Sequence, residues 1–148
     1  AGDEVLGSFV YRMPVDQEFT CKAGNEVMGF PKTVQALSTT RRGDRVVFAM
    51  HVDGQLELEV SFLEPKQDGP ASRVETGSYS YLHGEPHETP LSMDMGSGLI
   101  DVHTVEVELG PGLVATELRT LGLPKVPDFG TWGTGLTATF QLGHPLGA

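Results

Sequence analysis

The chain has 148 residues, a formal net charge of −10 and a sequence pI near 4.8. This length suits one hydrophobic core, so we expect a single domain over residues 1–148. The acidic balance repels phosphate groups, which excludes nucleic acids and anionic membrane surfaces as expected partners. No stretch approaches the roughly 18 consecutive apolar residues of a membrane-spanning helix, and the single Cys21 favours a reducing, cytoplasmic location.

The N-terminal third predicts a strand followed by a helix. Residues 8–13 read as the strand, and the helix is expected to begin at Asp16 as N-cap and to end near Gly24. Phe19 and Ala23 would share the helix face that docks on the sheet. Cys21, inside this helix, is expected to be a buried small hydrophobe.

Lys32 follows in an unusual setting, because Met, Gly, Phe and Pro precede it with little charge nearby. Most lysines are exposed, and we expect this for Lys22, Lys66 and Lys125. Burial of a lysine lowers its pKa by up to about 3–5 units. The neutral amine can then attack a carbonyl carbon and form a Schiff base. We therefore predict that Lys32 lies in a pocket, on the loop that leads into the next strand.

The rest of the chain reads as short alternating strands separated by Gly and Pro. Val46 to Phe62 predicts a hairpin with Asp53-Gly54 as its turn, and residues 65–75 predict an exposed loop. Val105 to Leu118 predicts a second hairpin around Gly110-Pro111-Gly112, and Leu136 to Leu142 predicts a final strand. The pattern is typical of a mainly β fold with one or two short helices.

Two further groups could bind ligands. The segment from Tyr81 to Glu88 contains His83 and His87 with two carboxylates, which could ligate zinc or iron. Its Gly and Pro residues favour a polar, solvent-facing turn instead. A third ligand would have to come from His51 or His103, and neither stands at a spacing typical of a metal site. Trp132 could form a ligand platform, although a packed aromatic residue is the simpler interpretation.

Three stretches around Lys32 resemble the acetoacetate decarboxylase family, whose members carry Val/Leu-Asp-Asn-Glu, Gly-Arg-Glu and Gly-Tyr-Pro-Lys-Lys. The corresponding residues are Val15-Asp16-Gln17-Glu18, Gly24-Asn25-Glu26 and Gly29-Phe30-Pro31-Lys32-Thr33, which line up without a gap. The later strands are similar in their order. The resemblance implies an antiparallel sheet that curls into a barrel-like core.

The resemblance also implies a site. Lys32 would be the catalytic Schiff-base lysine, and Met13, Phe30 and Thr33 would line the substrate pocket. Glu26 would support the loop. No metal and no cofactor are expected, the partner would be a small keto acid, and the chain would form a homo-oligomer.

Two departures from the family pattern matter. Thr33 stands where the family has a second lysine, so desolvation alone would have to lower the pKa of Lys32. The family also carries an active-site arginine and two glutamates in an N-terminal portion that we expect this chain to lack. The chain would then be a piece of a longer protein or a compact relative, and Glu4 in the place of one glutamate is a third interpretation.

These inferences predict a Schiff-base lyase of the acetoacetate decarboxylase type that acts on a small keto acid through Lys32. An aldolase or dehydratase that forms the same imine is one alternative, and Thr33 favours it. A non-catalytic module that binds a small ligand with the same fold is the other.

Overall fold

A computed structural model of the chain describes residues 7–146. These residues group into two compact units whose segments alternate along the chain. The first unit comprises the chain up to Val34, Ser72–Met95 and the chain from Gly135 onward, and the second comprises Gln35–Ala71 and Gly96–Thr134. Within the described residues both units are mainly β and each has one α-helix. The mainly β fold is confirmed, while the single domain stays a prediction.

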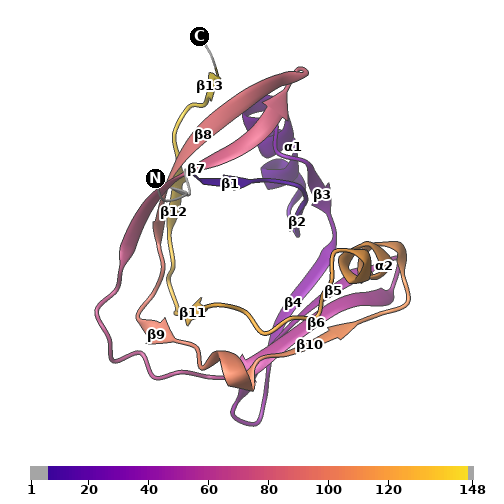
Figure 1. Cartoon of the computed structure of the whole chain (residues 1–148), viewed down its shortest axis with the longest axis vertical. Helices are drawn as coiled ribbons and strands as arrows, with labels where there is room; N and C mark the ends of the chain where they lie inside the picture. The colour runs from indigo at the N-terminus through magenta and orange to yellow at the C-terminus, as the bar shows by residue number, and fades with distance from the viewer. Residues whose placement is uncertain (1–6, 147–148) are drawn as a thin grey trace. The chain divides into compact units, whose positions relative to one another are not determined.

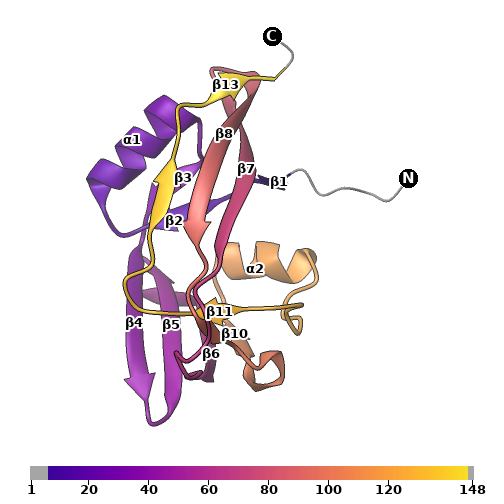
Figure 2. The ribbon, with the colours of Figure 1, turned by 90° about the vertical axis from the view of Figure 1, so that its left-hand side faces the viewer.

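The first unit is built on one sheet with strand order β1-β7-β8-β12, to which β13 adds at β8. Its strands are β1 (Gly7–Phe9), β7 (Arg73–Leu82), β8 (Glu85–Asp94), β12 (Ala138–Phe140) and β13 (His144–Pro145). β7 and β8 form a long hairpin whose turn residues, His83 and Gly84, have φ angles of 54° and 86°. Figure 2 shows β13 beside β8 near this turn. β2 (Met13–Val15) and β3 (Lys32–Val34) form a separate parallel pair.

Helix α1 (Glu18–Met28) lies between β2 and β3 in the chain and ends later than the sequence predicts. Its C-cap is Gly29, with a φ of 65°, whereas Gly24 lies buried in the helix interior. Phe19 is 83% exposed, so the prediction that it docks the helix on the sheet is wrong. The helix instead approaches β7 with its last turn, where Ser80 Oγ donates a 2.7 Å hydrogen bond to the Met28 carbonyl.

The second unit contains an antiparallel sheet with strand order β10-β6-β5-β4. Its strands are β4 (Ala36–Arg42), β5 (Arg45–Val52), β6 (Gln55–Leu63) and β10 (Glu106–Leu109). Asp53 and Gly54 form the turn between β5 and β6 with φ angles of 49° and 79°, which confirms the predicted hairpin. The short strands β9 (Gly98–Leu99) and β11 (Thr131–Trp132) pair, and a 3-10 helix spans Val102–Thr104.

Trp132 packs inside the second unit. Its ring meets those of Phe48 and Phe62 edge to face at 6.1 and 5.7 Å, and its Nε1 donates to Glu64 at 3.2 Å. Glu64 also accepts hydrogen bonds from Arg41, and this contact lowers the pKa of Glu64 to about 2. The prediction of a packed aromatic residue is confirmed.

Residues 113–120 form a helix, so the predicted second hairpin is wrong at its returning strand. Helix α2 (Leu113–Thr120) lies beside β6 and β10 (Figure 1). Glu57 in β6 is buried, and its carboxylate accepts a 2.7 Å hydrogen bond from the N–H of Ala115 in the first turn of α2. A Cβ on Gly112 would lie 1.7 Å from Glu57 Oε1, so the glycine is what allows this approach. A carboxylate at a helix N-terminus satisfies orphan N–H groups and complements the helix dipole.

We expect Glu57→Ala to lower the free energy of unfolding by about 2 kcal/mol, because it leaves the Ala115 N–H buried without an acceptor. Urea unfolding followed by circular dichroism measures this change. Glu108→Ala, at an exposed glutamate of β10, is the matched control and should change it by about 0.5 kcal/mol or less. Equal effects of the two substitutions would contradict the capping role.

The sheet of the first unit has β1 and β12 as its edge strands, and the larger sheet of the second unit has β10 and β4. Each of these sheets is therefore open within its own unit. The barrel-like core therefore remains an expectation. The final strand is also shorter than predicted, since β12 covers only Ala138–Phe140. Neither α1 nor α2, the helices of residues 7–146, has the length and apolar character that a membrane crossing requires.

Candidate active site around Lys32

Lys32 begins β3 and is only 9% exposed, as the sequence predicts for a lysine in this setting. The turn before it is fixed by Gly29, where a Cβ would lie 2.4 Å from the Tyr81 carbonyl oxygen. The Phe30 N–H then donates to the Gly24 carbonyl at 3.1 Å, which ties the loop back to α1. Lys22, Lys66 and Lys125 are all exposed, as predicted.

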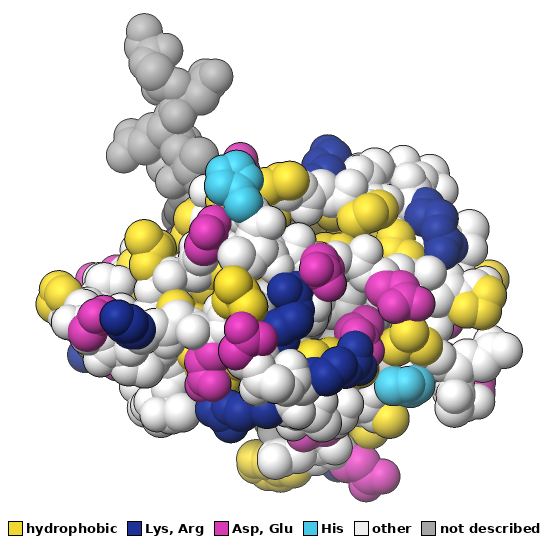
Figure 3. Space-filling model, turned by 90° about the horizontal axis from the view of Figure 1, so that it is seen from below, with side chains coloured by type: hydrophobic (Ala, Val, Ile, Leu, Met, Phe, Trp, Pro, Cys, Tyr) yellow, Lys and Arg dark blue, Asp and Glu magenta, His cyan; other side chains and the backbone are white. Residues whose placement is uncertain are grey.

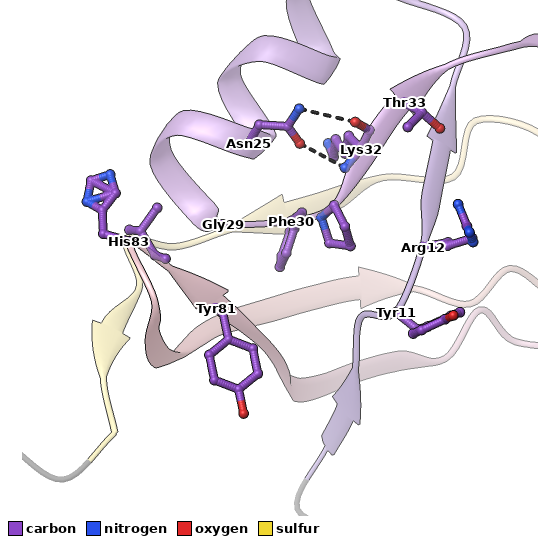
Figure 4. A pocket seen from close by; sticks show the side chains of 11 residues that line it. Tyr11, Arg12, Asn25, Gly29, Phe30, Lys32, Thr33, Tyr81 and His83 are labelled. Atoms are coloured by element: carbon purple, nitrogen blue, oxygen red, sulfur yellow. Dashed lines mark hydrogen bonds between the residues drawn. The ribbon is translucent and has the colours of Figure 1, made fainter.

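The backbone of Lys32 is held by Asn25 of α1 (Figure 4). The Lys32 N–H donates to Asn25 Oδ1 at 2.8 Å, and Asn25 Nδ2 donates to the Lys32 carbonyl at 3.1 Å. The Cys21 thiol, one turn earlier in the helix, donates to the same carbonyl at 3.4 Å. The Asn25 side chain thus pairs with both the backbone N–H and the backbone carbonyl of Lys32. These two bonds fix the position from which the lysine side chain extends.

The side chain of Lys32 runs against the backbone of α1. A Cβ on Gly24 would lie 2.5 Å from Cδ and Cε of Lys32 and 2.8 Å from Nζ. The amine lies 5.9 Å from the centre of the Phe30 ring and 6.0 Å from that of Phe140. These two rings meet edge to face at 5.6 Å. The amine therefore lies against the helix backbone at Gly24, with two aromatic rings nearby.

Two effects act on the protonation of Lys32. Burial lowers the pKa of its amine from the ordinary value near 10.5, and the neighbouring Cys21 opposes this shift. The aromatic faces favour the ammonium, but their distances are at the outer limit of about 6 Å for a cation–π interaction. Among residues 7–146 no carboxylate forms an ion pair with Lys32. Desolvation therefore dominates, and the pKa of the Lys32 amine lies below its ordinary value.

The predicted pocket residues separate onto two faces of the β2–β3 pair. Met13 lies opposite Lys32 in the parallel register, so their side chains point to the same face of the pair. The Phe30 ring lies on this face too, because the Lys32 amine is 5.9 Å from its centre. Thr33 follows Lys32 in the strand and points to the opposite face. A cavity of about 470 Å³ is lined by Phe30, Lys32 and Thr33 together with Tyr11, Arg12 and Tyr81, among others. Met13 is absent from this lining.

Glu26 lies on the exposed side of α1, and its neighbour Asn25 makes the contacts that hold the loop. The supporting role of Glu26 stays a prediction.

Sequence reasoning missed Gly24, Asn25 and Phe140, although Cys21 and Asn25 stand four residues apart and so share a helix face. Glu4 lies outside the described residues.

The two histidines of the β7–β8 hairpin have different environments. His83 is exposed in the turn, as predicted, whereas His87 is only 8% exposed, so the prediction of a solvent-facing residue is wrong there. His87 lies within β8, where alternation turns it to the covered face of the sheet. In residues 7–146 no three His, Cys, Asp or Glu side chains are grouped so as to hold a metal ion.

No protein-family model, curated protein or solved structure matches this chain. Figure 3 shows basic and acidic side chains interspersed over one face. In the second unit, Arg42 pairs with Glu59 at 3.3 Å and Arg45 pairs with Glu106 at 3.3 Å.

Proposed function

We propose that the chain is a Schiff-base lyase of the acetoacetate decarboxylase type that acts on a small keto acid through Lys32. The observation that carries the proposal is the buried Lys32 amine, which contacts Phe30 and Phe140 and has no carboxylate partner among residues 7–146. A protein retains such a group at a cost in stability of about 1.4 kcal/mol for each unit by which the pKa is lowered. A covalent role gives a reason for that cost.

The neutral amine would attack the ketone carbon of the substrate, and loss of water would give a protonated imine. The bond between the α-carbon and the carboxylate then breaks, and its electron pair moves into the imine. Carbon dioxide leaves and an enamine remains on Lys32. Protonation of the enamine carbon and hydrolysis of the imine release the ketone and restore the free amine.

The same imine supports a second reaction. If a proton rather than carbon dioxide leaves the α-carbon, the enamine can attack an aldehyde, which is aldolase chemistry, and loss of water then gives a dehydratase. Thr33, which replaces the second lysine of the family pattern, favours this alternative. The proposal also includes the barrel-like core, a homo-oligomer and a reducing cytoplasm, where Cys21 would remain a thiol. The side chains of Phe19 and Leu142, 83% and 84% exposed, are consistent with self-association.

Borohydride trapping tests the proposal. Incubation with acetoacetate, pyruvate or acetone and borohydride is expected to give a reduced adduct, and peptide mass spectrometry should place it on Lys32. Lys22 on the exposed side of α1 is an internal control and should stay unmodified. If no carbonyl compound of the panel modifies Lys32, the enzyme is excluded and a non-catalytic binding module becomes the better interpretation.

A further inference from the structure

The covered face of the first unit's sheet is polar where a core would ordinarily be apolar. Four of its side chains carry hydroxyl or imidazole groups and are at most 8% exposed: Ser78, Ser80, His87 and Thr89. They share one face, because Ser78 pairs with Thr89 and Ser80 pairs with His87 across β7 and β8. Polar groups buried in this number require a structural or chemical reason.

The register places this face beneath the aromatic residues that contact Lys32. Phe140 of β12 pairs with Leu91 of β8, so its ring stands on the same face as Thr89 and His87. Thr89 is two residues from Leu91 and is thus a diagonal neighbour of Phe140, at about 7–8 Å.

Phe30 connects the two sides of this face. The end of α1 is bound to β7 through Ser80 and the Met28 carbonyl, and Phe30 reaches from there to Phe140 on β12. Because β8 lies between β7 and β12 in the sheet, Phe30 crosses over β8. The Lys32 amine, 5.9 and 6.0 Å from the centres of the two rings, therefore lies over the same face of the sheet as His87 and Thr89.

Thr89 and His87 are the two groups without an evident structural task. Thr89 is 0% exposed, and its Oγ1 has no hydrogen-bond partner among residues 7–146. A buried hydroxyl without a partner costs roughly 1–3 kcal/mol, so it points to a polar ligand or water that completes it. The imidazole of His87 is covered by the chain at Gly143, where a Cβ would lie 2.6 Å from its Cδ2. Neither group forms an ion pair among the described residues.

We propose that His87 is the acid–base group of the Lys32 reaction and that the Thr89 hydroxyl binds the oxygen of the substrate or of the water that hydrolyses the imine. This inference rests on the proposed function and deepens it, since it assigns the proton transfers of that reaction to side chains of the sheet face. Imidazole both gives and takes protons near neutral pH. The imidazolium donates its proton to the enamine carbon, and the neutral imidazole takes a proton from the water that attacks the imine, so His87 returns to its starting state.

Proton exchange at carbon isolates this step. An imine that interconverts with its enamine exchanges the methyl protons of acetone and pyruvate for deuterium in heavy water, which proton NMR records. We expect His87→Asn to slow this exchange about 100-fold or more, while borohydride still traps the imine at Lys32. His103→Asn, at an exposed histidine of the second unit, is the matched control and should leave the exchange unchanged.

Chemical rescue separates acid–base catalysis from a packing role. His87→Ala removes the ring, and added imidazole is expected to restore at least a tenth of the lost exchange rate, which a purely structural residue would not show. Exchange by His87→Asn within twofold of the wild type, or loss of exchange without rescue in His87→Ala, would overturn the assignment of His87. An absence of trapping in the wild type would instead overturn the proposed function, and the His87 inference with it.

Discussion

Replacement of Lys32 by methionine is expected to abolish borohydride trapping and at the same time to stabilise the protein at neutral pH. Methionine keeps a flexible, unbranched side chain against Gly24, Phe30 and Phe140 but carries no charge to desolvate. The gain should be about 1.4 kcal/mol for each unit by which the pKa of Lys32 is lowered, less about 0.5–1 kcal/mol for the lost cation–π contacts. Replacement of an ordinary buried residue would instead lower the stability of the protein.

The pH dependence of this gain has a definite direction. The pKa of Lys32 is lower in the folded than in the unfolded state, so between these two values the unfolded chain binds more protons. The stability of the wild type therefore rises with pH across this window, up to the ordinary value near 10.5. The advantage of Lys32→Met should be full below the window and should vanish above it.

Urea unfolding of the wild type and of Lys32→Met at several pH values from 7 to about 10.5 measures this difference. Lys22→Met is the matched control, because Lys22 is exposed on α1 and its removal should give a small effect without this pH dependence. If Lys32→Met is less stable than the wild type at every pH, the amine is a structural cation and the proposed function loses its main support.

The elements that could be predicted are those determined by neighbouring residues. The turn at Asp53-Gly54 follows from the tolerance of Asp and Gly for positive φ and from the alternation of the flanking strands. The burial of Lys32 follows from the apolar residues around it. Residues 113–120 form a helix where a strand is expected, because a short apolar run fits a strand or a helix equally well. The carboxylate that caps this helix comes from Glu57 in β6, far away in the chain.

In the candidate site, too, the features that depend on residues distant in the chain could not be predicted. Gly24 reads locally as a helix terminator, yet its function in the structure is to leave room for the Lys32 side chain. His87 reads as a turn residue, and only the length of β8 and its register with β7 bring it to the covered face. Phe140 is separated from Lys32 by more than a hundred residues, so nothing in the local sequence indicates that its ring lies near the amine.

Gly24→Ala is expected to separate the reactivity of Lys32 from the stability of the fold. The added methyl group would overlap Cδ, Cε and Nζ of Lys32, and the flexible end of the lysine is the part that can move. Displacement of the amine towards water raises its pKa to the ordinary value, and the neutral fraction at pH 7 falls about tenfold for each unit regained. Trapping at neutral pH should slow by at least this factor, and its rate should reach a plateau only at higher pH.

The fold itself should tolerate this substitution. Alanine is favoured over glycine in a helix interior by about 1 kcal/mol, and the desolvation of the amine is relieved. A double-mutant cycle with Lys32→Ala provides the control, because this background lacks the atoms that the methyl group would meet. Gly24→Ala should then show the helix-propensity gain alone. A Gly24→Ala protein that traps keto acids with the wild-type pH profile would show that the helix backbone does not hold the amine out of water, and that a different feature would have to activate Lys32.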